Sequence, residues 1–439
     1  MPTQPDSSRS IALDVFRGLT MAGMILVSNP GGPLNYAPLE HAAWNGWTPT
    51  DLVFPSFAFI LGVALTFSLA SRRARTEWQG LSLFDWLVPI LLVAKFGQML
   101  AGQTAGFTHP PVPSIGGYNF FFAAMAVLLV LLPQLERRAV KHGGSLVLQV
   151  IHRGFVLFAL GFVWDFDATN PAGFRVLGVL QRLGIVYLVA GLIVLNTRRA
   201  VQAAWAGGLL AIYWVLMKSV PVPGHGAGVL TMEGNLAGYV DRLILGRAHM
   251  YEPRPLPYWD PEGILGSIPA VATGLLGALA GGWMREEHPA MQKIGRLLLA
   301  GIVLLVVGLS LNPWFPINKN LWSPSFVLVT GGFDFILLGA CIWVVDFKLV
   351  RRPFLPFIVL GSNSILIYVL SGTFMHYAGE ISGGTMNGVA ISAKDAAYQY
   401  GFAWWLSPQN ASLGMALAYV ALWMAIAGVL YHRRKFIKI

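Results

Sequence analysis

Long runs of apolar residues, each of about 20 positions, recur along the whole chain and alternate with short polar segments. A run of this length is what an α-helix needs to cross the hydrocarbon core of a bilayer. We predict an all-α polytopic membrane protein, a bundle of about 12 transmembrane helices with roughly 10 to 12 as the range. The period-two alternation that is typical of membrane β-barrels does not occur. The predicted spans lie near residues 11–29, 51–70, 84–103, 118–134, 147–165, 174–196, 199–217, 263–283, 292–312, 322–345, 353–376 and 411–431.

Basic residues follow every even-numbered span, whereas the odd-numbered loops are poor in Lys and Arg for their length. Positively charged loops stay in the cytoplasm, so we predict that both termini are cytoplasmic. The loop between the first two spans then lies on the outer face. Two long loops, residues 218–262 and 377–410, also lie there, and their length indicates a lid or a substrate site. We find no internal repeat and predict a single transmembrane domain, 1–439.

The composition agrees with a membrane protein and narrows the choice of partners. Of the 439 residues, 55% are hydrophobic and 11% are charged, whereas soluble domains carry about 25% charged residues. The net charge of +10 is explained by basic cytoplasmic loops, so we expect a lipid bilayer and no nucleic acid as partner. Because the chain has one cysteine, Cys341, it cannot form an intramolecular disulfide. The chain contains no CxxC or HExxH motif, and we expect no metal.

The loop between the first two spans is crowded with polar side chains, and His41 is its central residue. An imidazole titrates with an unperturbed pKa of about 6.5 and can act as acid, base or nucleophile. A nearby carboxylate, from Glu40 or Asp51, could hold its tautomer. The alternative is an interfacial histidine in an aromatic belt with Trp44 and Trp47.

Other polar residues lie at the end of the first span or inside the spans. The amide of Asn29 could hold a carbonyl or an oxyanion, or it could simply end the helix before Pro-Gly-Gly. Asp14 and Arg17 are three residues apart, so they share a helix face and could form an ion pair. Arg182 is a second buried cation, with Asp334 as a distant candidate partner. Such groups line a cavity or hold the bundle together.

Several motifs, spread in order over most of the chain, resemble the bacterial relatives of the heparan-α-glucosaminide N-acetyltransferase family. The resemblance covers these stretches: Leu13-Asp14-Val15-Phe16-Arg17-Gly18, Asn29-Pro30-Gly31, Glu40-His41-Ala42-Ala43-Trp44-Asn45-Gly46, Thr50-Asp51-Leu52-Val53-Phe54-Pro55, Gly178-Val179-Leu180-Gln181-Arg182-Leu183, Asp260-Pro261-Glu262-Gly263, Asn318-Lys319-Asn320-Leu321-Trp322-Ser323-Pro324-Ser325-Phe326 and Gly361-Ser362-Asn363-Ser364 with Tyr368.

The resemblance implies a transmembrane acetyltransferase in a bacterial inner membrane. Acetyl-CoA would serve as co-substrate from the cytoplasm, and a glucosamine-type amino sugar would accept the acetyl group at the periplasmic side. His41 matches the family's active-site histidine and Asn29 its nearby asparagine, with Asp14, Arg17 and Asp51 as supporting residues. The candidate substrate-binding residues are Glu40, Trp44, Asn45, Arg182, Glu262, Lys319, Asn320 and Asn363.

Two other functions fit parts of the pattern. A transporter of amino sugars or N-acetylglucosamine-related compounds would suit twelve spans with both termini inside, but we find no inverted repeat and no pair of broken helices in matching halves. A non-catalytic scaffold does not account for the density of polar residues at the outer membrane boundary. Whether the chain forms a homo-oligomer stays open.

Overall fold

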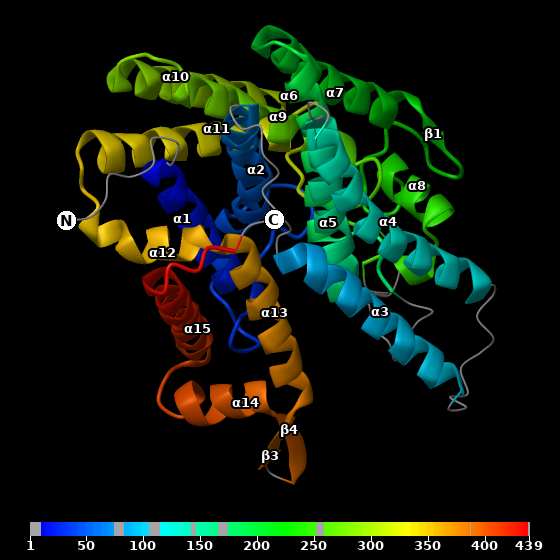
Figure 1. Ribbon diagram of the computed structural model, residues 1–439. Coiled ribbons are helices and arrows are strands. Elements are labelled where there is room, and N and C mark those ends of the chain that lie inside the picture. The colour runs from blue at the N-terminus through cyan, green and yellow to red at the C-terminus, as the bar shows by residue number, and fades with distance from the viewer. Residues whose placement is uncertain are drawn as a thin grey trace. The chain divides into compact units, whose positions relative to one another are not determined.

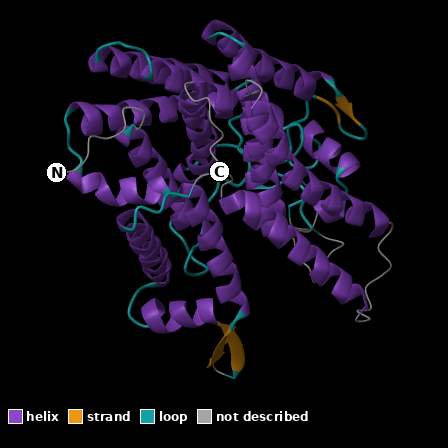
Figure 2. Ribbon diagram, in the orientation of Figure 1, coloured by secondary structure: helices purple, strands orange, loops and turns teal. Residues whose placement is uncertain are grey.

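The computed structural model describes residues 10–73, 83–104, 115–141, 146–165, 174–251, 259–386 and 388–437. Helices account for most of this part of the chain, and two short antiparallel hairpins supply its strands (Figures 1 and 2). The prediction of an all-α polytopic membrane protein is therefore confirmed.

The elements follow the apolar runs of the sequence closely. The α-helices are α1 (Ile11–Ser28), α2 (Pro49–Arg73), α3 (Leu83–Thr104), α4 (Ile115–Lys141), α5 (Leu146–Asp165), α6 (Val179–Asn196), α7 (Arg199–Ser219), α8 (Leu236–Ile244), α9 (Ser267–Met284), α10 (Ala290–Leu311), α11 (Pro324–Cys341), α12 (Leu355–Ser362), α13 (Ser364–Glu380), α14 (Ala393–Tyr398) and α15 (Pro408–His432). The strands are β1 (Pro221–Val222), β2 (Gly226–Ala227), β3 (Ser382–Met386) and β4 (Val389–Ser392). Short 3₁₀ turns cover Ala37–Leu39, Arg247–His249 and Arg352–Phe354, and π-helical turns cover Ile342–Phe347 and Gln399–Ala403.

Within the described residues, nine helices are long and apolar enough to cross a membrane. A tenth span results if Arg352–Ser362 and Ser364–Glu380 are counted together, although they meet at an angle of 76°. The helices α3 and α4 coincide with two further predicted spans but do not pass the same test over their described residues, so a count of twelve stays a prediction. The predicted continuous span 353–376 is wrong in one respect, because the helix breaks at Asn363.

The two long loops carry local structure of their own. The first contains the β1–β2 hairpin and α8, and its residues 252–258 lie outside the described residues. The second contains the β3–β4 hairpin and α14 (Figure 1). Both hairpins are antiparallel, with Val222 paired to Gly226 and Met386 to Val389.

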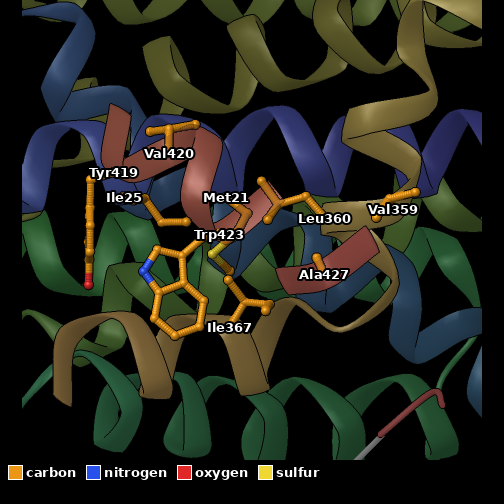
Figure 3. Close-up of a cluster of buried hydrophobic side chains, with 9 residues drawn as sticks. All are labelled: Met21, Ile25, Val359, Leu360, Ile367, Tyr419, Val420, Trp423 and Ala427. Carbon is orange, nitrogen blue, oxygen red and sulfur yellow. The ribbon is translucent and has the colours of Figure 1, made fainter. Parts of the chain in front are cut away.

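The chain divides into two compact units. The first, here called the His41 unit, comprises residues 1–57, 287–305 and 332–438, and the second, the Arg182 unit, comprises residues 58–286 and 306–331. In the His41 unit, α1, α12, α13 and α15 enclose an apolar core (Figure 3). Its buried members are Met21, Ile25, Val359, Leu360, Ile367, Tyr419, Val420, Trp423 and Ala427.

Glycines set the spacing of the helices in both units. In the His41 unit, a Cβ atom on Gly18 would overlap the carbonyl oxygen of Phe357, and one on Gly361 would overlap that of Asp14. In the Arg182 unit, Gly62 of α2 meets the backbone of Gly274 of α9 in the same way. Small residues allow membrane helices to approach closely and to form more van der Waals contacts. These contacts stabilise the packing of helices in lipid, where the hydrophobic effect does not drive helices together.

Candidate active site in the loop between α1 and α2

The imidazole of His41 lies against a buried carboxylate. Its Nδ1 atom is 2.6 Å from Oδ1 of Asp51. The Asp51 side chain is 1% exposed, whereas the His41 side chain is 55% exposed. Asp51 belongs to the first turn of α2, where unpaired backbone N–H groups and the helix dipole stabilise negative charge. The structure thus places an accessible imidazole on a shielded anion.

The backbone of the same loop fixes the Asp51 carboxylate. Its Oδ2 atom accepts hydrogen bonds from the backbone N–H of Ala42 at 3.1 Å and of Thr48 at 3.0 Å. The Thr48 hydroxyl lies 2.6 Å from the carbonyl oxygen of Glu40 and 3.2 Å from Oδ2 of Asp51. Since a hydroxyl has one proton, the nearer carbonyl oxygen is its main acceptor. Because Oδ2 is bound by two backbone donors, Oδ1 is held toward His41.

This geometry determines which nitrogen of His41 carries the proton. An ionised carboxylate only accepts hydrogen bonds, so Nδ1 donates to Asp51 and the lone pair of the neutral ring is on Nε2. A lone pair in this position can take a proton from an amine or attack an acyl carbon. The carboxylate then stabilises the imidazolium that forms. Of the two predicted orienting carboxylates, the structure pairs Asp51 with His41, while Glu40 contributes its backbone carbonyl.

Three predicted binding residues share this loop with His41. Glu40 and Asn45 are exposed, and Trp44 is half-buried. The neighbouring indole of Trp47 packs against Phe333 of α11, with ring centroids 5.1 Å apart. The loop is therefore anchored to α11 while its polar side chains remain accessible.

Asn29 ends α1, and its side chain binds back to the helix. The side chain is buried, and its Nδ2 atom donates to the carbonyl oxygen of Ile25 at 2.9 Å. Since the last carbonyls of a helix lack intrahelical donors, this bond satisfies one of them. The alternative that the sequence left open, a helix stop, is what the structure contains.

Asp14 and Arg17 form the predicted ion pair, with Arg17 Nη1 at 3.3 Å from Asp14 Oδ1. The same guanidinium reaches the carbonyl oxygen of Gly361 in α12 at 3.5 Å. The start of α2 packs beside Gly23, nine residues along α1 from Asp14, and nine residues rise by about 13 Å. The pair therefore joins α1 to α12, and its place among the supporting residues of the catalytic site stays a prediction.

Charged residues in the Arg182 unit

A second group of charged residues surrounds the N-terminal end of α9 in the Arg182 unit. Arg175 binds Asp260 through two hydrogen bonds of 2.6 and 3.2 Å and also binds Glu262. The charges of Arg182 and Lys319 also act on Glu262. Three predicted binding residues, Arg182, Glu262 and Lys319, are thus brought into one cluster from separate parts of the sequence.

The charge balance of this cluster keeps Glu262 ionised. Burial by itself would raise the pKa of Glu262, but the positive charges of Arg175, Arg182 and Lys319 outweigh it and lower the pKa. A buried carboxylate needs such partners, because an isolated charge is costly to remove from water.

Arg182 is buried and lies over the ring of Trp322, 4.9 Å from its centroid. Trp322 has a φ of 50°, which is uncommon for a residue with a side chain, and its Nε1 atom donates to Thr273. The predicted pairing of Arg182 with Asp334 is wrong: Arg182 donates to the carbonyl of Gly263, and Asp334 bonds to Ser56 in the His41 unit. Asn320 lies half-buried in the loop before Trp322.

Asn363 connects the break between α12 and α13 to the C-terminal segment. It is buried at the break between α12 and α13, and its amide binds the C-terminal segment at two points. Nδ2 donates to the carbonyl of Lys435 at 3.0 Å, and Oδ1 accepts from the backbone N–H of Ile437 at 2.7 Å. Both ends of the amide thus hold the C-terminal segment, and its role in substrate binding stays a prediction.

Sequence reasoning missed three residues that shape these sites. Thr48 could have been found, because Thr48-Pro-Thr-Asp51 has the spacing of a capping box, in which the acidic residue reaches back to the backbone N–H of the threonine. Arg175 and Asp241 carry no local signal, because only the folded chain brings them to residues 260–264. In the part of the chain that the structure describes, no three His, Cys, Asp or Glu side chains are grouped as metal ligands.

Comparison with known proteins shows what the chain is similar to. No family model matches it. Heparan-alpha-glucosaminide N-acetyltransferase of Homo sapiens is 28% identical over 485 aligned positions, which cover 99% of this chain and 60% of the human protein. The Mus musculus protein of the same name is 27% identical over 493 positions, covering 99% of this chain and 62% of its own length. The chain is a homologue of these proteins and spans about three fifths of their length.

Proposed function

We propose that the chain is a transmembrane acetyltransferase that moves the acetyl group of acetyl-CoA to the amino group of a glucosamine-type sugar. The observation that carries the proposal is the pairing of the accessible His41 ring with the buried Asp51 carboxylate. Homology to two proteins named as N-acetyltransferases supports the reaction class. The apolar helices support a multi-pass membrane protein.

The proposed chemistry begins at Nε2 of His41. This atom takes a proton from the sugar ammonium group, and the resulting amine attacks the thioester carbonyl. A C–N bond forms, the C–S bond breaks, and the CoA thiolate leaves with a proton, so that one proton is released for each ammonium group acetylated. A second route uses the same lone pair as nucleophile: it attacks the thioester carbonyl, the C–S bond breaks, and the CoA thiolate leaves with a proton. The sugar amine then attacks the acetyl group on His41, and the bond between the acetyl carbon and Nε2 breaks. In both routes Asp51 stabilises the positively charged ring.

The proposed topology follows from the distribution of basic residues. The loops that follow the even-numbered predicted spans are basic. This distribution of charge favours cytoplasmic termini and an inner-membrane location in a bacterium. His41 then faces the periplasm, and acetyl-CoA enters from the cytoplasm. Its pantetheine arm must extend between helices to bring the thioester to the imidazole.

The proposed acceptor site uses groups that recognise sugar hydroxyls and an ammonium group. Glu40, Trp44 and Asn45 lie in the same loop as His41 and offer a carboxylate, an indole face and an amide. We assign substrate binding to these residues on their chemistry.

Labelled acetyl-CoA provides the direct test. Purified protein in lipid nanodiscs is incubated with acetyl-labelled acetyl-CoA, with and without glucosamine, beside His41→Ala. The expected result is labelled N-acetylglucosamine and free CoA from the parent and neither from His41→Ala. A parent protein that releases no CoA and acetylates no sugar would overturn the proposal. Label trapped on His41 in the absence of glucosamine would identify the two-step route.

One observation favours an amino-sugar transporter as the second candidate. Transporters build their substrate sites from discontinuous helices, and α12 and α13 form such a broken span. The amide at the break, Asn363, is occupied by the C-terminal segment, which weighs against a substrate there. Uptake of unmodified labelled glucosamine into proteoliposomes without any acetyl donor would support the transporter and count against the acetyltransferase.

A further inference from the structure

Asp334 is a buried carboxyl group in the middle of α11. It is 2% exposed, and its Oδ1 atom lies 2.5 Å from the hydroxyl oxygen of Ser56 in α2. The Ser56 hydroxyl is also 2.9 Å from the carbonyl oxygen of Leu52. Among the residues that the structure describes, Oδ2 of Asp334 has no hydrogen-bond partner.

This arrangement is satisfied by a protonated carboxyl group. Ser56 has one hydroxyl proton and two oxygen neighbours. If Asp334 carries a proton, it donates to Ser56 and Ser56 donates to Leu52, so every proton has an acceptor. An ionised Asp334 would instead compete with Leu52 for a single proton and keep an unsatisfied charge inside a membrane span, which is costly.

Two adjacent residues of α11 contact α2, which carries the Asp51 carboxylate, and the loop that precedes it. Ser56 follows Asp51 by five residues in α2, a rise of about 7.5 Å, and it is held by Asp334. Phe333 packs on Trp47, which lies in the loop that binds Asp51. These contacts fix the first turns of α2 and the adjoining loop from one side.

We infer that Asp334 is a positioning residue for the His41 site: a neutral carboxyl that, through Ser56, holds the start of α2 so that Asp51 meets the His41 ring. Phe333 performs the same task through Trp47. The inference rests on the proposed acetyltransferase function. A displacement of about 1 Å in a reacting group can cost roughly 100-fold in rate, so the contact acts on turnover rather than on substrate affinity.

Two substitutions at one position separate a neutral hydrogen-bond donor from a charge. Asp334→Asn keeps a donor to Ser56 and cannot ionise, whereas Asp334→Leu removes the hydrogen bond while keeping the same branching and number of side-chain heavy atoms. We expect kcat of Asp334→Asn within about twofold of the parent and kcat of Asp334→Leu lower by about 10- to 100-fold, with the KM for acetyl-CoA unchanged in both. Leu337→Ala, on an exposed position of α11, serves as the control and should match the parent.

A chemical readout tests the same inference without relying on acetyl transfer. The rate at which diethylpyrocarbonate modifies His41, measured by mass spectrometry, should be the same in the parent and Asp334→Asn and should change in Asp334→Leu. Equal loss of kcat in Asp334→Asn and Asp334→Leu would overturn the inference that Asp334 acts as a neutral carboxyl group. Parent-like kcat and modification rate in Asp334→Leu would overturn the positioning role. If the parent itself transfers no acetyl group, the proposed function fails, while the modification rates still decide whether Asp334 positions the loop.

Discussion

Arg182 and Asp241 bind the two ends of one peptide bond. Arg182 Nη2 donates to the carbonyl oxygen of Gly263 at 3.1 Å, and Asp241 Oδ1 accepts from the backbone N–H of Ile264 at 2.8 Å. The peptide group therefore connects a buried cation to a buried acid and fixes the segment that leads into α9. Burial is the main cause that raises the pKa of Asp241 to about 7. The negative charge of Asp260 raises this pKa further, whereas the hydrogen bond from the Ile264 N–H and the charges of Arg182 and Arg242 lower it.

The raised pKa predicts that the protein loses stability as the pH increases toward neutrality. The folded state keeps a proton on Asp241 up to a pH of about 7, whereas the unfolded chain releases it near a pH of about 4. Between these values the folded state binds more protons, so the free energy of unfolding falls as the pH rises, and it levels off above about 7. Asp241→Asn should remove the contribution of Asp241, so its decline should be less steep than that of the parent. Thermal unfolding in detergent across the interval measures it.

An exposed acid in the same unit supplies the control for that experiment. Glu233 is exposed, so Glu233→Gln should retain the full decline of the parent. If Asp241→Asn declines with pH as steeply as Glu233→Gln does, another group titrates in this interval.

The close approach of α1 and α12 predicts a large difference between two glycine substitutions in one helix. A methyl group at Gly18 would overlap the carbonyl of Phe357, whereas one at Gly23 would lie 3.4 Å from the nearest atom of Val53. We expect Gly18→Ala to lower the free energy of unfolding by about 1 to 3 kcal/mol. Gly23→Ala should stay within about 1 kcal/mol of the parent, because alanine favours the helix and the contact is ordinary. Unfolding by SDS titration measures both, and equal effects would contradict the close approach.

The amide of Asn363 predicts where the C-terminal segment is attached. Asn363→Ala removes both hydrogen bonds to residues 435 and 437, so trypsin should cleave after Arg433 and Arg434 several times faster than in the parent. Intact-mass analysis of timed digests measures the loss of the C-terminal fragment. Ser364→Ala, at the neighbouring position, should digest like the parent. An increase in the KM for the sugar without faster digestion would instead restore Asn363 to the substrate site.

Local patterns in the sequence account for the parts of the structure that were predicted correctly. Apolar runs gave the positions of the helices, because length and hydropathy are properties of contiguous residues. The pairing of His41 with Asp51 was within reach because ten residues and one helix N-terminus separate them. Asp14 and Arg17 were paired correctly because the helical period places them on one face.

Contacts between distant segments were beyond this reasoning. The sequence offers no way to decide that Asn363 binds residues 435 and 437 or that Asp334 binds Ser56, since polar groups of the right type occur in many places. The hydrogen bond of Asn29 to the carbonyl of Ile25 is likewise visible only in the folded helix. All of these contacts concern which partner a buried polar group finds.

The site itself offers a comparison of two carboxylates, one in the loop of His41 and one in the first turn of α2. Glu40→Gln removes the charge of the exposed carboxylate, and Asp51→Asn removes that of the buried one. We expect Glu40→Gln to leave kcat within about threefold of the parent, because exposed charges contribute little. Measured beside it, a large loss in Asp51→Asn assigns the orienting role to Asp51, and a larger loss in Glu40→Gln would reverse that assignment.

Asp51→Asn should inactivate the site by reversing the tautomer of His41. The backbone N–H groups of Ala42 and Thr48 need an acceptor at the position of Oδ2, so the amide oxygen of the new side chain takes that place and its NH₂ group faces Nδ1. The ring must then accept at Nδ1 and carry its proton on Nε2, which removes the lone pair that the reaction uses. We expect kcat to fall by about 100- to 10,000-fold, as when the aspartate of a catalytic triad is replaced by asparagine. Steady-state acetyl transfer and the nitrogen chemical shifts of labelled histidine measure the rate and the tautomer. A parent-like rate with a reversed tautomer would show that Nε2 of His41 is not the reacting atom.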